Sequence, residues 1–309
     1  MKLTLLKAEH LGMCFGVRDA IALALEHADR APVTILGELV HNETVLASLR
    51  ERGVQYAANA ESVATRNVMV TAHGASDRAI NRARALGLNV VEATCPLVHH
   101  AHAALRKLAA AGFHPVVIGR RDHVEVRGLT EDLETFDVVL TEADVAQLQE
   151  RPRFGVVAQT TQAIEKVRQI VALIEKRFPR SEVRFSDTVC QPTKQRQTAA
   201  IQLARQCDVV IVIGGANSNN TRELVATCGR FCKHVRHVQT AADLRLDWFQ
   251  DGDVVGITAG TSTPDSLIHE VESWLEGASD GATTPADSEG FTDVARRESR
   301  QPETVGDRG

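Results

Sequence analysis

Three cysteines, Cys14, Cys95 and Cys190, are the residues whose type and spacing point most directly to chemistry in this chain of 309 residues. Each lies in a short irregular segment beside an apolar run, and the stretches between them are each the size of a small domain. This layout predicts one metal centre that three lobes of the protein share.

The three thiolates are compatible with more than one centre. They could supply three ligands of a cubane iron–sulfur site, which usually takes four, and the missing ligand would leave one iron open to a substrate as a Lewis acid. Zinc held by three cysteines and one histidine is a second interpretation, although the short C-x-x-C pairs typical of structural zinc are missing. Buried free thiols are a third. Spacing alone leaves all three open.

Short polar side chains follow several apolar runs, in a weak threefold repeat of loops of about domain size. Together they are typical of a hydrogen-bonding cup for an anion such as a diphosphate. The candidate residues are His41, His73, His123, Thr160, Ser218, Asn219, Asn220 and Ser262. The run from Gly214 to Thr221 combines a glycine turn, polar residues and a helix start, which suits phosphate held by backbone N–H groups.

The elements that must position these residues follow an α/β pattern. Apolar, β-branched runs alternate with helix-like stretches, as in parallel sheets covered by helices. The predicted strands are Val33 to Leu36, Val68 to Val70, Val116 to Ile118, Val156 to Val157, Val209 to Ile213 and Val254 to Ile257. The predicted helices are Val17 to His27, Ser76 to Ala85, Val98 to Ala110, Ala163 to Arg177, Thr193 to Arg205, Arg222 to Gly229 and Asp265 to Leu275.

The repeat predicts three similar α/β lobes with small parallel sheets around a central cavity. Ligands bind beyond the carboxyl ends of parallel strands, where all of these loops would lie. The expected domains are residues 15–95, residues 96–189, and residues 190–276 together with 1–14. Residues 277–309 are rich in Gly, Ala, Ser, Thr, Pro and charged residues, which predicts a disordered tail.

Composition and charge limit the partners and the compartment. A formal net charge of −5 and the lack of a basic run between aromatic residues argue against nucleic acid as a partner. The sequence shows no signal peptide and no apolar stretch long enough to span a membrane, so we expect a cytoplasmic protein without a membrane partner. In that compartment the cysteines are expected to be free thiols or metal ligands.

A series of short motifs in one order makes the sequence similar to a known family. The motifs are Gly12 to Val17, Val40 to Asn42, Ala72 to Gly74, Ala93 to Val98, His123 to Gly128, Gln159 to Thr161, Arg196-Gln197, Asn217 to Asn220 and Thr258 to Ser262. In this order they resemble the 4-hydroxy-3-methylbut-2-enyl diphosphate reductase family. The resemblance runs from Gly12 to about Leu275, so it covers nearly all of the chain except the tail.

The resemblance implies an oxidoreductase that removes an allylic hydroxyl reductively, giving isopentenyl and dimethylallyl diphosphates in the last step of the non-mevalonate route. It implies one 4Fe-4S cluster held by Cys14, Cys95 and Cys190. Glu125 would be the proton source and Thr160 would hold the hydroxyl and pass the proton. The diphosphate would be bound by His41, His73, His123, Ser218, Asn220 and Ser262, with Asn219 beside them. The electrons would come singly from a ferredoxin or flavodoxin type of donor.

Two positions depart from the pattern of the family. Asn219 stands where a second Ser is common, and Val124 stands where Pro commonly precedes the Glu. These departures leave a diverged relative acting on another allylic diphosphate as an alternative. A zinc-dependent hydrolase or lyase of phosphorylated metabolites and a non-catalytic iron–sulfur sensor or cluster carrier are further alternatives.

Overall fold

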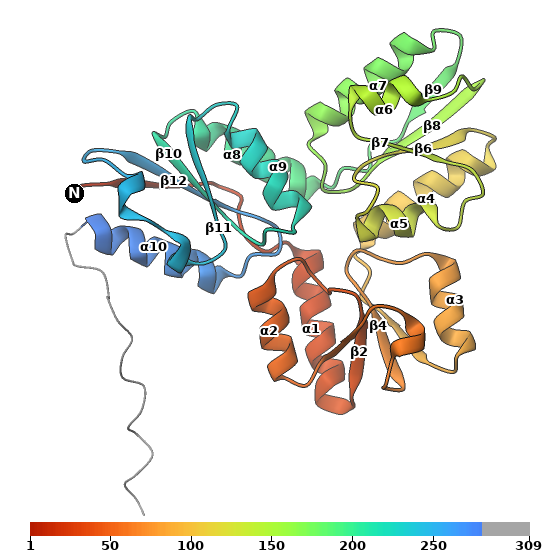
Figure 1. The fold of residues 1–309 in the computed structure, drawn as a ribbon, viewed down its shortest axis with the longest axis horizontal. Helices are drawn as coiled ribbons and strands as arrows, with labels where there is room; N and C mark the ends of the chain where they lie inside the picture. The colour runs from red at the N-terminus through yellow and green to blue at the C-terminus, as the bar shows by residue number, and fades with distance from the viewer. Residues whose placement is uncertain (280–309) are drawn as a thin grey trace, which may run out of the picture.

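The computed structural model describes residues 1–279, which form three four-stranded parallel sheets with helices packed against them (Figure 1). All of the strand pairs are parallel. The α/β class with three small parallel sheets, predicted from the sequence, is therefore confirmed.

The first sheet has the strand order β3-β2-β4-β5. Its strands are β2 (Val33–Leu36), β3 (Gln55–Ala57), β4 (Asn67–Val70) and β5 (Asn89–Glu92). Its helices are α1 (Phe15–Arg30), α2 (Glu43–Glu51) and α3 (Asp77–Ala85), with a short 3-10 turn, η1 (Ala60–Ser62). Helix α2 is missing from the sequence prediction, although Asn42 caps it by accepting a hydrogen bond from the Val45 N–H at 3.3 Å.

The second sheet has the order β7-β6-β8-β9. Its strands are β6 (His114–Ile118), β7 (Asp137–Val139), β8 (Arg153–Ala158) and β9 (Glu182–Phe185). Its helices are α4 (Pro96–Ala110), α5 (Val124–Thr130), α6 (Glu142–Gln147) and α7 (Ile164–Arg177).

The third sheet joins the start of the chain to its last third, in the order β1-β12-β10-β11. Its strands are β1 (Thr4–Lys7), β10 (Val209–Ile213), β11 (His234–Val238) and β12 (Val254–Ala259). Its helices are α8 (Gln191–Ala204), α9 (Asn219–Cys228) and α10 (Asp265–Ser279), with 3-10 turns η2 (Ala241–Asp243) and η3 (Leu246–Trp248).

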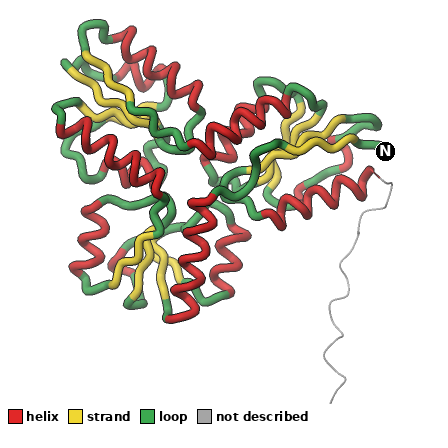
Figure 2. The backbone as a smooth tube through the Cα atoms, turned by 180° about the vertical axis from the view of Figure 1, so that it is seen from behind, coloured by secondary structure: helices red, strands yellow, loops and turns green. Residues whose placement is uncertain are grey.

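The three sheets radiate from a common centre, and one end of each sheet faces that centre (Figure 2). Each sheet has its own apolar core, built on one face around residues such as Ile35, Phe154 and Ile211. Close packing makes such cores stiff. The loops at the inner strand ends are therefore carried on rigid supports.

The end of helix α10 differs from the sequence prediction. The helix continues to Ser279, so residues 277–279, which the sequence placed in a tail, are helical. The rest of the predicted tail, residues 280–309, lies outside the described residues. The predicted domain boundaries stay a prediction. No helix within residues 1–279 has both the length and the apolar character that a membrane crossing requires.

Candidate metal centre and anion site

The three cysteines lie where the chain passes from one sheet to the next. Cys14 follows β1 and precedes α1, Cys95 follows β5 and precedes α4, and Cys190 follows β9 and precedes α8. Each is the N-cap residue of its helix. The positive end of a helix favours a thiolate. The sequence therefore begins each crossing helix with a potential anionic ligand.

A backbone hydrogen bond fixes each cysteine to the loop that follows a neighbouring strand. The N–H groups of Cys14, Cys95 and Cys190 donate to the carbonyl oxygens of Thr261, Ala72 and Thr160, each at 3.0 Å. The next residue after Thr261 is Ser262, and the next after Ala72 is His73. Each cysteine is thus held directly beside one of the predicted substrate-binding loops.

The side chains of the three cysteines also approach one another. A Cβ atom on Gly16, two residues after Cys14, would lie 2.5 Å from the Sγ atom of Cys95. Glycine at this position leaves the space in which the Cys95 sulfur sits. Electrostatic repulsion from Cys14 contributes to a raised pKa at both Cys95 and Cys190. The three thiols are free and partly buried, and Cys14 is close enough to act electrostatically on both of the others.

Burial is the main cause of these raised pKa values. It raises the pKa of the Cys95 thiol, while the N–H groups of Leu97 and Val98 act in the opposite direction. Burial raises the pKa of Cys190 to about 11, opposed by Thr193, whose Oγ1 atom lies 3.1 Å from the Cys190 sulfur. A metal would have to displace these protons, and Thr193 could then donate to the Cys190 thiolate.

Thiolates are ligands that both zinc and iron–sulfur clusters take in proteins. Zn–S bonds of about 2.3 Å in tetrahedral geometry would bring the sulfur atoms to within about 4 Å of one another. Within residues 1–279, the one group of potential ligands whose donor atoms all lie within 4.8 Å of one another is His41, His73 and His123. The three cysteines are not part of that group.

Glu125 lies between the cysteines and the polar loops. Its side chain is 1% exposed, and Oε1 accepts a hydrogen bond from the Thr160 N–H at 2.6 Å. Burial raises the pKa of this carboxyl to about 7, although bonding from Thr160 opposes the shift. Its negative charge would in turn contribute to the raised pKa of Cys95 and Cys190. The site thus holds a buried acid that exchanges its proton near neutral pH.

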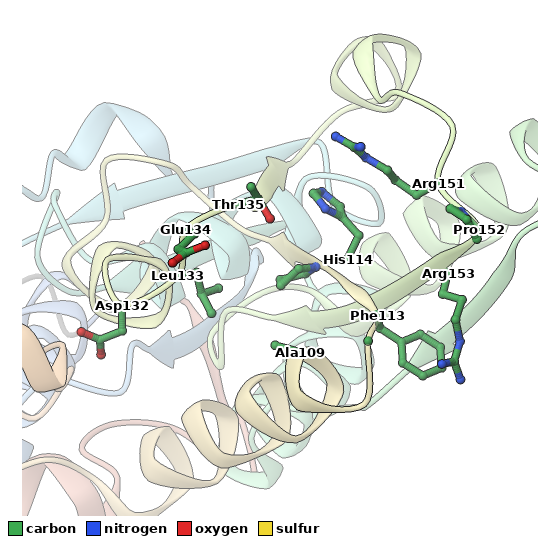
Figure 3. Close-up of a pocket in the computed structure, with 12 residues that line it drawn as sticks. Ala109, Phe113, His114, Asp132, Leu133, Glu134, Thr135, Arg151, Pro152 and Arg153 are labelled. Carbon is green, nitrogen blue, oxygen red and sulfur yellow. The ribbon is translucent and has the colours of Figure 1, made fainter.

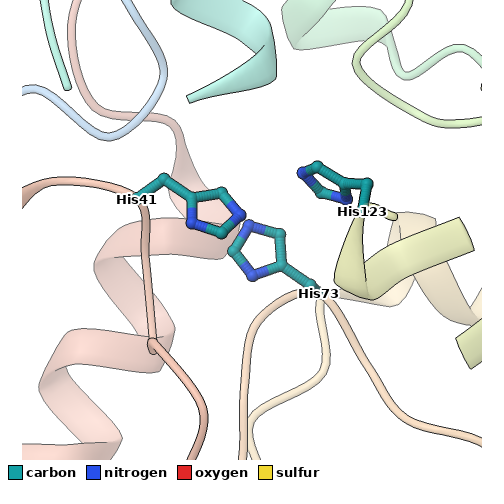
Figure 4. Close-up of side chains that lie close together, drawn as sticks. All are labelled: His41, His73 and His123. Carbon is teal, nitrogen blue, oxygen red and sulfur yellow. The ribbon is translucent and has the colours of Figure 1, made fainter. Parts of the chain in front are cut away.

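The three histidines form a cluster whose rings face one another (Figure 4). His41 stacks on His73 with ring centroids 4.4 Å apart, and His123 meets both rings edge-on at 5.1 and 5.4 Å. Burial lowers the pKa of His123 to about 3 and the pKa of His73 well below its usual value, and repulsion from His41 adds to both shifts. His73 and His123 are therefore neutral at pH 7.

Hydrogen bonds assign the ring protons of two of these histidines. Nδ1 of His123 accepts from the Glu125 N–H at 3.2 Å, so Nε2 of the neutral ring carries the proton and is a donor. Nδ1 of His41 lies 3.0 Å from a carboxylate oxygen of Glu38, so Nδ1 carries a proton. Nε2 of His41 is buried without a partner and donates only when the ring is charged. A donor at His123 suits an anion better than a metal ion.

The polar run before α9 supplies further groups at the same place. Ser218 is the N-cap of α9 and accepts from the Thr221 N–H, which leaves its hydroxyl free to donate. Oδ1 of Asn220 accepts from the Thr261 N–H, while its Nδ2 is buried without a partner. Ser262 Oγ donates to the His41 carbonyl at 3.3 Å. These groups and the α9 N-terminus favour an anion.

Asn219 contacts the opposite side of the cavity. Its Nδ2 atom donates to the carbonyl oxygen and to Oγ1 of Thr161, at 3.2 and 3.1 Å, and its Oδ1 atom is buried without a partner. The amide therefore joins the third sheet unit to the second. The small cavity that these loops enclose has a volume of about 30 Å³. Its lining includes His41, His73, His123, Thr161, Ser218, Asn219, Asn220 and Ser262.

Three polar residues that the sequence analysis left without a role complete the surroundings. They are Glu38, which pairs with His41, and the adjacent Arg196 and Gln197 in α8. The pair Arg196-Gln197 is part of a motif in the sequence, but no local pattern indicates a partner for either residue. Glu38 lies only three residues before His41, so a His–carboxylate spacing was the signal that could have identified it.

A larger hollow of about 530 Å³ lies away from this centre, at the amino ends of β6 and β8 (Figure 3). Two of its lining side chains are already paired: His114 bonds to Asp137 at 2.7 Å, and Arg153 bonds to Glu182 at 2.9 Å while stacking on Phe113. Ligands of parallel sheets bind at the carboxyl ends. The central cavity is therefore the candidate site.

The fold and the site define a three-sheet α/β protein in which cysteines, a buried acid and anion-binding groups meet at one centre. Residues 5–276 match the family model described as LytB protein, so the chain belongs to this family. Proteins named 4-hydroxy-3-methylbut-2-enyl diphosphate reductase from Trichlorobacter lovleyi and Geobacter sulfurreducens are each 38% identical. The matches cover 87% and 85% of this chain and 96% and 94% of those relatives.

Solved structures of reductases with the same type of name share the fold. The E-1-hydroxy-2-methyl-but-2-enyl-4-diphosphate reductase from Plasmodium falciparum has a TM-score of 0.83 at 26% identity, over 89% of this chain and 88% of that one. A second structure, titled (E)-4-hydroxy-3-methyl-but-2-enyl diphosphate reductase, the terminal enzyme of the non-mevalonate pathway, has a TM-score of 0.64 at 35% identity. That match covers 89% of this chain and 99% of the other.

The raised pKa of Glu125 predicts a pH-dependent cost to stability. The carboxyl has a pKa of about 7 when folded and an ordinary value of 4.5 when unfolded, so its contribution is favourable below pH 4.5 and is lost as the pH rises through 7. We therefore compare the free energy of unfolding of Glu125→Gln with that of wild type, both without metal. The difference should favour the variant more at pH 8 than at pH 4.5, by up to about 3 kcal/mol. Urea unfolding at both pH values measures this.

The exposed Glu9 provides the matched control, because Glu9→Gln removes the same charge without a buried contact. That variant should follow wild type at both pH values. An equal effect of Glu125→Gln at pH 4.5 and pH 8 would contradict the shifted pKa.

Proposed function

We propose that this chain reductively dehydroxylates 4-hydroxy-3-methylbut-2-enyl diphosphate to isopentenyl and dimethylallyl diphosphates, the last step of the non-mevalonate route. The relatives reported above are named as reductases of this diphosphate, and an iron–sulfur cluster is characteristic of the family. The observation that supports the proposal most is the set of three backbone bonds that join each cysteine to a polar loop of the anion site.

The residues present fit the cofactor. Cys14, Cys95 and Cys190 would hold one 4Fe-4S cluster, with Thr193 donating a hydrogen bond to the Cys190 sulfur. When bound, the cluster would supply electrons one at a time and an iron that polarises the substrate hydroxyl. A ferredoxin or flavodoxin type of donor would deliver the electrons.

The anion groups would bind the diphosphate through complementary donors. His123 offers its Nε2 proton, Asn220 its unpartnered amide nitrogen, and Ser218 its hydroxyl. His41, His73 and Ser262 line the same cavity. Glu38 would orient the His41 ring by accepting a hydrogen bond from its Nδ1. Binding would thus provide partners for buried polar atoms that lack them in the protein alone.

Glu125 and Thr160 would transfer a proton to the departing hydroxyl oxygen. The reaction consumes two electrons and two protons, breaks the allylic C–O bond and releases water. A carboxyl with a pKa of about 7 is partly protonated at neutral pH and can protonate the departing oxygen. Thr160, bonded through its backbone to Glu125, would hold the hydroxyl at the point where this proton is transferred.

The other functions are less well supported. The relatives are named as reductases, so a zinc-dependent hydrolase or lyase is not favoured. Val124 is the first residue of α5, a position that accepts Pro or Val without loss of a helical hydrogen bond. This departure therefore gives little reason to expect a different allylic substrate.

An anaerobic assay tests the proposal. Purified without oxygen, the protein should hold about four iron atoms per chain, as expected for one cubane cluster. It should also reduce 4-hydroxy-3-methylbut-2-enyl diphosphate with reduced viologen. Glu125→Gln should keep the iron and lose at least about 100-fold in kcat, the scale of general acid catalysis. Product analysis with iron and sulfide counts on each sample provides the measurement.

Three results of this assay would count against the proposal. If the wild-type protein held no iron after anaerobic reconstitution, the proposed iron–sulfur cofactor would be ruled out. Zinc in place of iron would favour the hydrolase. Full activity of Glu125→Gln would refute its role as the proton source, and a stable cluster without any reductase activity would favour the sensor or carrier.

Asn219 should affect substrate affinity through its bond across the cavity. A cavity of about 30 Å³ has room for about one water molecule, so a diphosphate can enter only if the loops separate. Asn219→Ser removes the two bonds to Thr161, which makes closure over the substrate less favourable. We expect KM to rise about 2- to 10-fold with little change in kcat, because one hydrogen bond contributes about 0.5–1.5 kcal/mol.

A double-mutant cycle with Thr161→Val provides the control. If Asn219 acts through Thr161, the two substitutions should affect KM less than additively. Strictly additive effects would show that the bond from Asn219 to Oγ1 of Thr161 does not contribute to KM.

A further inference from the structure

Arg196 is a buried cation two turns into α8, the helix that begins after Cys190. Its side chain is 7% exposed. Nε and Nη2 donate to the carbonyl oxygen of Gly12 at 3.0 and 2.6 Å, and Nη1 donates to the carbonyl oxygen of Pro192 at 3.0 Å. One side chain thus joins a segment near the start of the chain to a helix 184 positions later.

The segment that Arg196 holds leads directly to Cys14. The N–H groups of Gly12 and Cys14 donate to the carbonyl oxygens of Ala259 and Thr261. Gly12 has a φ of 72°, and a Cβ atom there would lie 2.8 Å from Cδ1 of Ile268, so the chain has no space to move toward α10. From α8, the guanidinium of Arg196 donates two hydrogen bonds to the carbonyl oxygen of Gly12. It therefore fixes Cys14 relative to Cys190.

The charge of Arg196 has no carboxylate partner. None of the ion pairs within residues 1–279 includes it. Burial and the nearby Arg18 lower its pKa, and the groups that favour its charged form are Cys14 and Cys190. A buried charge without a partner is costly. Two thiolates beside the guanidinium would compensate it.

We propose that Arg196 positions the Cys14 segment against α8 and supplies the internal positive charge for the metal–thiolate centre. The inference rests on the proposed iron–sulfur centre and goes beyond its ligand set. Three thiolate ligands bring negative charge into a buried site, and each added electron increases it. A fixed cation beside two of the ligands favours the reduced state, so it raises the reduction potential of the centre.

The two parts of this role can be separated by substitution. Arg196→Gln removes both the charge and the bidentate contact with Gly12. Arg196→Lys keeps a positive charge next to the thiolates but cannot reproduce the planar fork. The matched control is Arg205→Gln, which removes an exposed charge at the end of the same helix.

Hydrogen exchange and a redox titration provide the test. In metal-free protein, hydrogen exchange followed by mass spectrometry should show at least tenfold faster exchange in residues 9–16 for Arg196→Gln and Arg196→Lys, and wild-type exchange for Arg205→Gln. In anaerobically reconstituted protein, an EPR-monitored titration should show the ratio of reduced to oxidised cluster for Arg196→Gln at least tenfold lower at a fixed potential. This corresponds to a shift of about 59 mV for one electron. Arg196→Lys should keep the wild-type potential.

Wild-type exchange in both Arg196 variants would overturn the positioning role, and a wild-type potential in Arg196→Gln would overturn the charge role. If Arg196→Gln does not fold, the Arg196→Lys variant provides the test. Wild-type hydrogen exchange in Arg196→Lys would refute the positioning contact with Gly12. A ratio of reduced to oxidised cluster at least tenfold below that of wild type would refute the charge role. If the wild-type protein binds no iron, the proposed function fails, whereas the exchange measurement still tests the contact with Gly12.

Discussion

The site depends on one repeated interaction, the hydrogen bond from the backbone of each cysteine to the loop that ends a neighbouring strand. The three N–H···O distances are the same, 3.0 Å, in three separate sheets. Backbone bonds do not depend on the side chain, so each sheet presents a thiol and a polar loop in a fixed relation. Where the inner ends of three sheets meet, the thiols and the polar loops must both converge. The close approach is shown by Gly215, where a Cβ atom would lie 2.2 Å from the His41 carbonyl oxygen.

Where the loops converge, several buried polar atoms have no hydrogen-bond partner within residues 1–279. Nε2 of His41, Nδ1 of His73, Oδ1 of Asn219 and Nδ2 of Asn220 are buried without hydrogen-bond partners. Each such atom costs about 1–3 kcal/mol. The separate apolar cores of the three sheets offset that cost away from the site. A bound anion removes part of it, so ligand binding and stability are linked at this centre.

The sequence predicted the centre of each sheet better than its edges. The six predicted strands correspond to β2 and β4, β6 and β8, and β10 and β12, which are the two inner strands of each sheet. Inner parallel strands are buried on both faces and form continuous apolar runs, as Val209–Ile213 does. Outer strands such as β5 and β9 have no fully buried residue: β5 exposes both ends, and β9 alternates between exposed and partly buried positions, so they lack that signal. The short helices α5 and α6 were missed for the related reason that six or seven residues carry little periodicity.

Contacts between distant segments could not be predicted from the sequence, for a different physical reason. Arg196 and Gln197 are neighbours in α8, but they bind opposite parts of the chain: Arg196 holds Gly12, and Gln197 accepts from the Ile164 N–H and donates to the Gln162 carbonyl. These partners leave no pattern in the sequence, because they are backbone groups, which every residue has. Helix α8 therefore connects the segment before Cys14 with the loop after Thr160. Cys95 has no tie to α8 among these bonds and relies on packing against Gly16. The three cysteines are thus positioned by unequal means, and the bond from Arg196 joins α8, which begins after Cys190, to the segment before Cys14.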